Sequence, residues 1–448
     1  MLPKLENCTV AIIGLGYVGL PLMLEICKKS ICLLTQKKLH RRVIGFDINA
    51  KRIDELDKGF DRNKIFSSQE LKKATNIKFV NNENSIKDAD VFIITVPTPI
   101  NEKNEPNLSY IKKASKMVGK LIKYNDKRLT NPIIIFESTV YPGLTEEICI
   151  PIIERESNKK HNSIQFKNSF YCGYSPERIN PGDSKHTLDS ITKVTSGCNQ
   201  KVANWIDNFY GSFINGGTFK ASSIKVAEAA KIIENTQRDI NIALINELSI
   251  LFKKLNINTY EVLDAASTKW NFHKYMPGLV GGHCIGVDPY YLTFKAKEIG
   301  HETKLISAGR NINDYMHHYV IEQILFHKSK RKVYFANEEI LLLGLSYKSN
   351  CGDIRNSQLI NLVKIFQNKK MNITLVDPKV NREEVLENEG LSTLSSIPIN
   401  KKYTIIILAL YHDEFKELTK DKLLDFCLED TLIFDLTHNL DGENIIHL

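Results

Sequence analysis

The sequence predicts an α/β protein with two Rossmann-like, doubly wound domains that a long central helix joins. A glycine fingerprint follows the first apolar strand, and buried strands then alternate with amphipathic helices through about residue 210. A second series of apolar strands begins near Asn337. Between the two series, residues 223–255 contain no glycine or proline. Parallel sheets covered by helices on both faces explain this order of signals.

The central helix is predicted from apolar residues at helical spacing. They are Val226, Ala230, Ile233, Ile240, Leu244, Leu248 and Leu251. Such a helix can join domains and also form a contact between two copies, so we expect a homodimer. The expected domains are a dinucleotide-binding domain at residues 1–215, a central segment at 216–325 and a second α/β domain at 326–448. Strands of the second domain are expected at 339–345, 373–378, 404–410 and 432–435.

The glycine fingerprint spans residues 14–19, between the apolar strand 9–13 and a helix that opens at Leu20. In this context the first glycine makes the tight turn, the second lets a pyrophosphate approach the backbone, and the third lets the helix pack on the strand. The helix N-terminus attracts the anion. We therefore expect a dinucleotide site that includes Gly14, Gly16, Tyr17, Val18 and Gly19.

The next strand, residues 42–47, ends in Asp47, which can accept hydrogen bonds from the adenosine ribose and repel a 2′-phosphate. This favours NAD over NADP. Asp47 lies 28 residues after Gly19, against about 20 in the usual fingerprint. The surplus falls in the lysine-rich stretch before the strand and indicates a longer helix end or a surface loop. Lys51 and Arg52 nearby could instead serve a phosphate, which leaves NADP open.

A single cysteine, Cys284, lies in a glycine-rich bend (Gly281, Gly282 and Gly286), four residues before Asp288. Combined with a dinucleotide site, a thiol in such a bend can capture an aldehyde and carry oxidation beyond the alcohol stage. The sequence therefore indicates a dehydrogenase with a covalent step.

Glu228, Lys231, Asn235 and Arg238 share one face of the central helix, at spacings of three, four and three. One interpretation is a solvated face on which Glu228 pairs with Lys231. The other is a site that holds an oxyanion and a hydroxyl near the thiol, because an amide within a cationic stripe suits that task.

The composition is that of a globular protein with 42% hydrophobic and 25% charged residues. The net charge of +8 is spread along the chain with acidic residues interleaved, so no nucleic-acid partner is expected. No apolar run is long enough for a membrane span, and the start lacks a signal-peptide pattern, so we expect a cytoplasmic protein. Nine scattered cysteines without a CxxC pair suggest neither disulfides nor a metal site.

Seven motifs occur in the order seen in the UDP-glucose/GDP-mannose dehydrogenase family, which nearly the whole chain therefore resembles. They are Gly14 to Gly19, Val96-Pro97-Thr98-Pro99, Ser138-Thr139-Val140, Ser175-Pro176-Glu177-Arg178, Ala229-Ala230-Lys231 with Asn235, Gly281-Gly282-His283-Cys284 with Asp288, and Gly352-Asp353-Ile354-Arg355. The resemblance implies an NAD-dependent oxidation of a nucleotide sugar at C6 in two hydride transfers.

The resemblance also implies roles for individual residues. Cys284 corresponds to the nucleophile, and Lys231, Asn235 and Asp288 correspond to polar residues beside it. Thr139 and Glu177 correspond to residues that bind the catalytic water and transfer protons. The expected cofactor contacts beyond the fingerprint are Asp47, Arg52, Pro97, Thr98, Thr139 and Arg355. The expected substrate contacts are Glu177, Arg178, Lys231, Asn235, Arg238, Gly281 and Lys348.

The sugar is indicated by departures from the UDP-glucose branch, which usually has a second glutamate where Pro181 stands. Together with residues 269–272 and 282–291, this resembles the UDP-N-acetylhexosamine branch, which supplies uronic acids for capsule and O-antigen. UDP-N-acetylglucosamine or UDP-N-acetylgalactosamine is the expected substrate, with UDP-N-acetylmannosamine and UDP-glucose as alternatives. An arginine that the UDP-glucose branch offers across its dimer is not evident between Ala265 and Gly281. A two-electron hydroxyacid dehydrogenase and a non-catalytic NAD sensor are more distant alternatives.

Overall fold

The computed structural model describes residues 1–448 except 64, 75, 124–129, 164–168, 179–186, 283, 332–337, 441, 443 and 444. The chain divides into two compact units. The first unit comprises Met1–Ile233 and Tyr290–Lys295, and the second comprises Glu234–Pro289 and Ala296–Leu448. Among the described residues, no helix is both long and apolar enough to cross a bilayer.

The first unit is built on a seven-stranded parallel sheet in the order β3-β2-β1-β4-β5-β7-β6. The strands are β1 (Thr9–Ile13), β2 (Arg42–Phe46), β3 (Ile77–Val80), β4 (Val91–Ile94), β5 (Ile133–Phe136), β6 (Lys160–His161) and β7 (Ser169–Tyr174). Every residue of β4 and β5 is buried, as their continuous apolar sequences require in a sheet covered on both faces. The strand order reverses direction between β1 and β4, so a doubly wound sheet is confirmed.

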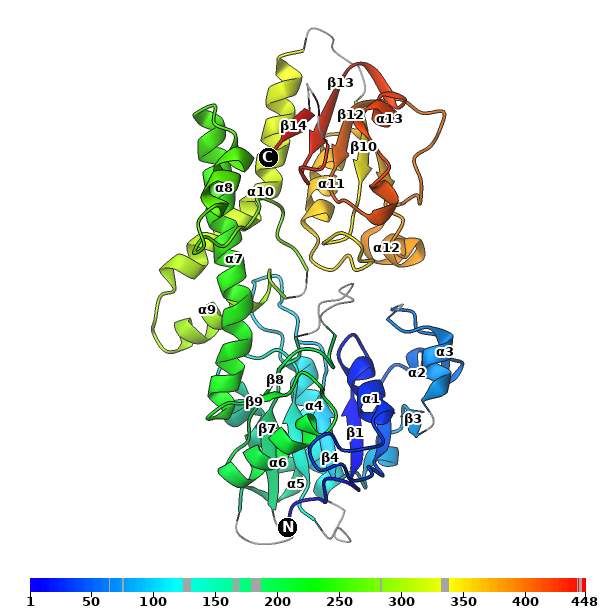
Figure 1. The fold of residues 1–448 in the computed structure, drawn as a ribbon, viewed down its shortest axis with the longest axis vertical. Helices are drawn as coiled ribbons and strands as arrows, with labels where there is room; N and C mark the ends of the chain where they lie inside the picture. Colours follow the sequence, from blue (N-terminus) through cyan, green and yellow to red (C-terminus); the bar gives the residue numbers. More distant parts are fainter. Residues whose placement is uncertain are drawn as a thin grey trace. The chain divides into compact units, whose positions relative to one another are not determined.

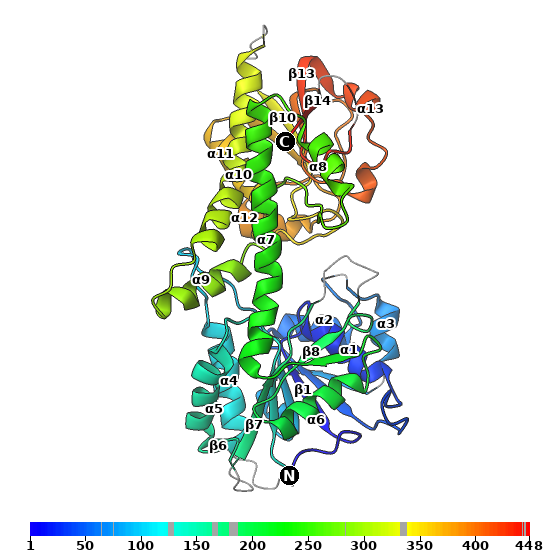
Figure 2. The same ribbon diagram turned by 60° about the vertical axis from the view of Figure 1, so that its left-hand side comes forward.

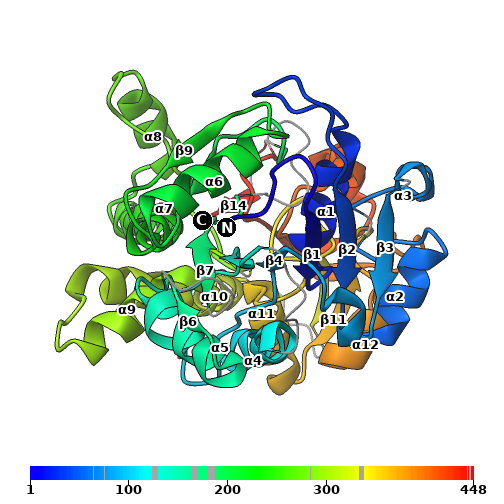
Figure 3. The ribbon, with the colours of Figure 1, turned by 90° about the horizontal axis from the view of Figure 1, so that it is seen from below.

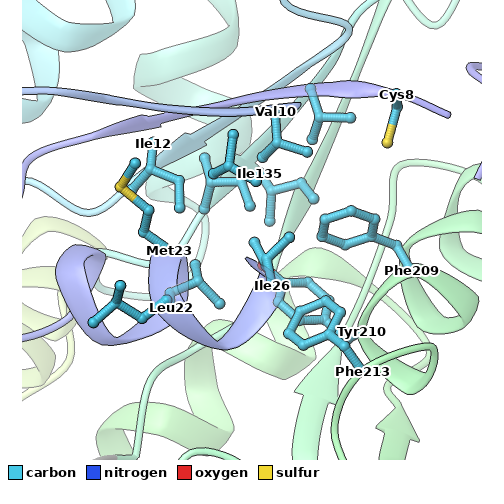
Figure 4. Packing of buried hydrophobic residues seen from close by; sticks show 14 of the residues in the cluster. Cys8, Val10, Ile12, Leu22, Met23, Ile26, Ile135, Phe209, Tyr210 and Phe213 are labelled. Atoms are coloured by element: carbon cyan, nitrogen blue, oxygen red, sulfur yellow. The ribbon is translucent and has the colours of Figure 1, made fainter. Parts of the chain in front are cut away.

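Helices cover both faces of this sheet (Figure 1). They are α1 (Gly19–Lys28), α2 (Ala50–Asp57), α3 (Ser68–Lys73), α4 (Ser109–Lys123), α5 (Ile150–Ser157) and α6 (Gln200–Gly211), with the short helices η1 (Glu83–Ile86) and η2 (Thr145–Cys149) and the strand pair β8 (Lys193–Thr195) and β9 (Thr218–Lys220). Figure 3 shows α1 and α6 on one face of the sheet and α4 and α5 on the other. Side chains of β1, β5, α1 and α6 form one buried cluster, in which Ile12, Ile135, Met23 and Phe209 lie (Figure 4).

The lysine-rich stretch before β2 is a surface loop, because α1 ends at Lys28. Ile31 and Lys38 form an antiparallel bridge in this loop, and the amide of Cys32 donates to Lys37 O at 2.8 Å. The prediction of a loop is therefore right and that of a longer helix is wrong. The loop accounts for the long spacing between the fingerprint and Asp47.

The predicted central helix is confirmed as α7 (Ile224–Lys254), whose 31 residues begin in the first unit and continue in the second. Its continuity follows from the absence of an internal glycine or proline. Several of its apolar side chains are exposed rather than buried, including Leu244 at 51% and Leu251 at 47%.

The second unit contains a five-stranded parallel sheet in the order β11-β10-β12-β13-β14, as predicted for a second doubly wound domain. Its strands are β10 (Glu339–Leu343), β11 (Asn372–Val376), β12 (Tyr403–Leu408), β13 (Cys427–Asp435) and β14 (Ile445–His447). Its remaining helices are α8 (Thr259–Ser267), α10 (Lys304–Ser329), α11 (Gln358–Asn368), α12 (Arg382–Glu389), η3 (Asp413–Phe415) and α13 (Lys420–Leu424). The helix α9 (Asp288–Glu298) is divided between the units, because Tyr290–Lys295 belong to the first. The predicted start near Asn337 lies outside the described residues.

Candidate active site

The glycine fingerprint forms the turn between β1 and α1 that a dinucleotide requires. Gly14 has φ +100°, and its amide donates to Phe46 O at 2.8 Å. A Cβ at Gly19 would lie 1.9 Å from Gly14 O, so only glycine allows this close packing of helix on strand. A Cβ at Gly16 would meet no atom within 4 Å. Gly16 therefore faces open space on the loop, where a pyrophosphate can approach the backbone. The loop fits NAD.

Asp47 follows β2 and serves this loop directly. Its Oδ2 accepts from the Leu15 amide at 2.9 Å, and its Oδ1 accepts from the Asn49 amide at 2.9 Å. The carboxylate is half-buried, so it also faces solvent beside the loop. Arg52 is 5% exposed and points beneath the loop, where its Nε donates to Leu15 O and its Nη1 lies 2.8 Å from Asp61 Oδ1. Arg52 thus braces the loop, and Lys51 is the exposed cation of the two.

The loops after β4 and β5 lie on the other side of the strand reversal. Pro97 is exposed and Thr98 half-buried, and Thr98 O accepts from the buried Tyr291 hydroxyl at 2.7 Å. Ser138 Oγ donates to Val96 O at 2.7 Å, which joins the two loops. Thr139 follows and is half-buried. These loops leave the carboxyl ends of adjacent parallel strands, where doubly wound sheets bind ligands.

Glu177, after β7, is held by charged and backbone groups of the first unit. Lys193 Nζ donates to Glu177 Oε2 at 2.8 Å and to Glu137 Oε2 at 2.9 Å. The Arg178 amide donates to Glu177 Oε1 at 2.6 Å. The Arg178 guanidinium turns to α7, where it donates to Ala230 O at 2.9 Å and to Lys231 O at 3.3 Å. Arg178 therefore fixes the backbone of the helical turn that carries Lys231.

The expected solvated pair of Glu228 and Lys231 is wrong. Glu228 is fully buried, and its carboxylate accepts from the Gly143 amide at 2.6 Å and the Thr145 amide at 3.0 Å. Burial raises the pKa of Glu228 to about 7, although the hydrogen bonds from Thr145 and Gly143 oppose the rise. Lys231 is also buried, at 5% exposure. The turn at residues 143–145, which follows Thr139, provides both of the amides that donate to Glu228. The spacing of residues along α7 could not reveal these partners.

In the second unit, Asn235 and Asp288 come together as the sequence predicts for polar groups of one site. Asn235 Nδ2 donates to Asp288 Oδ2 at 2.6 Å, and both residues are buried. Cys284 O accepts from the Asp288 amide at 2.9 Å, so a helical turn connects the half-buried thiol residue with the carboxylate. Arg238, one turn after Asn235, forms an exposed ion pair with Glu234 at 3.1 Å.

The bend before Cys284 packs on the loop after β10. Gly282 has φ +87°, and a Cβ there would lie 2.7 Å from the Tyr347 ring. A Cβ at Gly281 would lie 2.6 Å from Asn356 O. Asn356 Nδ2 donates to Gly282 O at 3.3 Å. Both glycines are therefore required by close approach, and the cysteine bend is fixed to the segment that contains Lys348 and Arg355.

The loop after β10 repeats the geometry of the fingerprint without its second and third glycines. Gly344 has φ +99°, and the Leu345 amide donates to Asp377 Oδ2 at 2.7 Å, as Leu15 does to Asp47. Asp377 is 1% exposed. Burial alone would raise its pKa, but His412 and backbone donors lower it below the usual value. The Asp377 carboxylate is therefore buried and accepts hydrogen bonds from its own domain, whereas the Asp47 carboxylate is partly exposed to solvent.

A cavity of about 260 Å³ lies at the strand reversal of the second sheet, between the ends of β10 and β12. Ser346, Lys348, Ser349 and Leu410 are among its lining residues. Lys348 therefore lines a concave site, and its contact with the substrate stays a prediction. Arg355 lies outside this lining, and its guanidinium is bidentate on Asp353, with Nε–Oδ1 at 2.9 Å.

Two Rossmann-type sheets, one with a complete dinucleotide loop, define an NAD-binding oxidoreductase with a second nucleotide-binding domain. Three family models match in chain order: the NAD binding domain at residues 8–214, the central domain at 225–315 and the UDP binding domain at 341–442. The chain belongs to the UDP-glucose/GDP-mannose dehydrogenase family.

Relatives and solved structures match over nearly the full chain. A UDP-N-acetyl-D-glucosamine 6-dehydrogenase of Pseudomonas aeruginosa is 45% identical over 98% of this chain and 99% of its own. One of Salmonella typhi is 46% identical over 98% of each. The structure of a UDP-D-ManNAc dehydrogenase from Pyrococcus horikoshii is similar, with a TM-score of 0.83, 27% identity and 98% coverage of both chains.

Several contributing residues were not predicted from the sequence: Glu137, Lys193, Tyr347 and Asn356. A carboxylate directly after the apolar strand β5 was a usable signal for Glu137, since strand ends bear ligands. Lys193 and Asn356 lie in short polar stretches without a pattern. His283 and the predicted branch-specific stretch with Pro181 lie outside the described residues.

Proposed function

We propose that this enzyme oxidises the C6 hydroxyl of UDP-N-acetylglucosamine to a carboxylate and so supplies a uronic acid for a surface polysaccharide. The observation that carries this proposal is full-length identity of 45% and 46% to relatives with that named activity. The proposal is also supported by the presence of every residue type that the family motifs require at these positions: Cys284, Asn235, Asp288, Lys231 and Glu177.

Two NAD molecules, bound one after the other, would each supply the acceptor for one hydride. Residues 14–19 would hold the pyrophosphate, and Asp47 would accept hydrogen bonds from the ribose hydroxyls. Cys284 acts between the two oxidations: its sulfur bonds to the aldehyde carbon, which makes a thiohemiacetal that can be oxidised to a thioester. Water then breaks the carbon–sulfur bond, which releases the carboxylate and restores the thiol.

The polar residues stabilise charge and move protons in this scheme. Lys231 and Asn235 stabilise the oxyanion that develops at each addition, and the Asp288 carboxylate fixes the Asn235 amide. Glu177 and Thr139 orient the attacking water and exchange its proton. The cavity beside Lys348 takes the uridine diphosphate end, because a cation and two serine hydroxyls suit phosphate oxygens.

A panel of UDP-sugars tests the substrate. A site that hydrogen-bonds an acetamido group leaves polar groups unpaired when the sugar offers only a hydroxyl. The kcat/KM for UDP-N-acetylglucosamine should therefore exceed that for UDP-glucose by at least about a hundredfold, roughly 2.7 kcal/mol. Faster turnover of UDP-N-acetylmannosamine or UDP-glucose would reject the sugar assignment.

We further propose that the enzyme is a homodimer with α7 at its interface. Leu244, Leu251 and Leu255 are 51%, 47% and 56% exposed, and their spacing places them on one face of the helix and its end. A second copy would cover this apolar face. Light scattering should report a dimer for wild type and a monomer for Leu244→Glu/Leu251→Glu, whereas Ile399→Glu, at an exposed site elsewhere, should stay dimeric. A monomeric wild type would refute this.

A further inference from the structure

A cluster of three charged side chains is buried in the first unit, and only one of them, Glu177, has a role in the proposed chemistry. Lys193, Glu137 and Glu177 are 1%, 2% and 7% exposed. One ammonium donates to both carboxylates, at 2.9 Å to Glu137 and 2.8 Å to Glu177. Buried charges on this scale are costly unless each one is paired, so the cluster must be tightly organised.

Four separate elements build this cluster. Lys193 begins β8, Glu137 follows β5, and Glu177 follows β7; β7, β8 and α6 are labelled in Figure 2. The Tyr210 hydroxyl of α6 donates to Glu137 Oε1. Ser175 Oγ donates to Val194 O at 2.7 Å and so ties the segment of Glu177 to the strand of Lys193. The backbone therefore holds all three charged groups in register.

The cluster has two carboxylates and one ammonium. Burial disfavours charge on Lys193, yet Glu137 and Glu177 together raise its pKa, so it stays charged. Burial raises the pKa of Glu137, with Lys193 opposing the rise. Burial also raises the pKa of Tyr210 well above its usual value, so the phenol stays neutral. Glu137 and Glu177 thus share one ammonium, and Glu177 also accepts from the Arg178 amide at 2.6 Å.

We propose that Lys193 is a positioning residue for Glu177: its ammonium holds that carboxylate in place, and Glu137 weakens this hold by competing for the same ammonium. The inference rests on the proposed function, in which Glu177 exchanges catalytic protons. It adds two buried residues, Lys193 and Glu137, that act on the reaction through Glu177.

Substitutions at the two partners should shift the pH profile in opposite directions. In Lys193→Met, Glu177 loses its cation and gains a proton more readily, so the acidic limb of kcat/KM should move up by about one pH unit and kcat should fall about tenfold or more. In Glu137→Gln, the ammonium serves Glu177 alone, so the acidic limb should move to lower pH with kcat at its plateau within about threefold of wild type. Lys193→Arg, which keeps a cation, should restore the profile in part.

Thr195→Val is the matched control, because Thr195 lies on the same strand and its hydroxyl donates to Asp207 on α6 at 2.7 Å, away from the cluster. Its pH profile should match wild type. Circular dichroism and NAD binding report whether each variant folds. If Lys193→Met fails to fold, Glu137→Gln alone decides: an unmoved or upward-moved limb overturns the proposal.

The sugar with the fastest turnover in the panel is used throughout, so an error in the sugar assignment leaves this test intact. If the folded variants have the turnover and the pH profiles of wild type, the positioning role of Lys193 is refuted, while the proposed function stands. No NADH production from any sugar overturns the proposed function and this inference together.

Discussion

Alanine at Gly16 and at Gly19 should separate cofactor binding from folding within one loop. A Cβ at Gly19 would lie 1.9 Å from Gly14 O and 2.5 Å from Thr95 Oγ1, and that hydroxyl is fixed by its bond to Gly14 O at 2.8 Å. Relief requires the helix to move off the strand, at a cost of about 1–3 kcal/mol or more. For a domain of this size that cost lowers Tm by roughly 2–12 °C.

Gly16→Ala is expected to leave Tm within about 2 °C of wild type, because the added methyl meets no atom within 4 Å and no positive φ is involved. The methyl would instead occupy the space into which the pyrophosphate moves, so Kd for NAD should rise at least tenfold, about 1.4 kcal/mol. Differential scanning fluorimetry and isothermal titration calorimetry measure the two quantities. Wild-type NAD affinity in Gly16→Ala would refute this account of the loop.

Three further substitutions test other parts of the account. Asp47→Ala should raise KM for NAD about tenfold and lower the ratio of kcat/KM for NAD to kcat/KM for NADP. If the wild-type enzyme prefers NADP, Lys51 would hold the 2′-phosphate of that cofactor and the assignment of NAD would be refuted. Glu228, with its pKa raised from 4.5 to about 7, contributes stability that is fully present below about pH 4.5 and lost as pH rises through about 7. Urea melts should therefore show wild type losing about 3 kcal/mol more than Glu228→Gln between these pH values, and equal losses would contradict the assignment. Cys284→Ala should lower turnover about a thousandfold with unchanged NAD affinity, whereas Cys427→Ala should leave turnover unchanged; retained activity in Cys284→Ala would exclude the covalent step.

Local patterns in the sequence were sufficient to predict the fold and the glycine loop after β1. The glycine loop, Asp47 and the strands around them are encoded within short stretches, since turn geometry and strand burial depend on neighbouring residues. Residues 223–255 predicted α7 because nothing in them interrupts a helix. Asn235 and Asp288 were both expected near Cys284 from family motifs, but the hydrogen bond between them was not predicted.

The remainder depends on contacts between distant segments. Glu228 shares a helix face with Lys231, but its partners are amides 85 and 83 residues away, at Gly143 and Thr145. Lys193 joins two carboxylates from different strand ends, and its own sequence context does not differ from that of a surface lysine. Arg52 was expected at the cofactor; the structure shows that it contacts Leu15 O beneath the loop and pairs with Asp61, which the sequence did not reveal.

The ratio of NADH formed to UDP-N-acetylglucosamine consumed tests the central claim most directly. If Cys284 retains the aldehyde and passes it to a second oxidation, each sugar should yield two NADH and one uronate, with no aldehyde trapped by an added hydrazine. Absorbance at the NADH band and chromatography of the nucleotide sugars give both numbers in one reaction. A ratio of one with a released aldehyde would contradict the account.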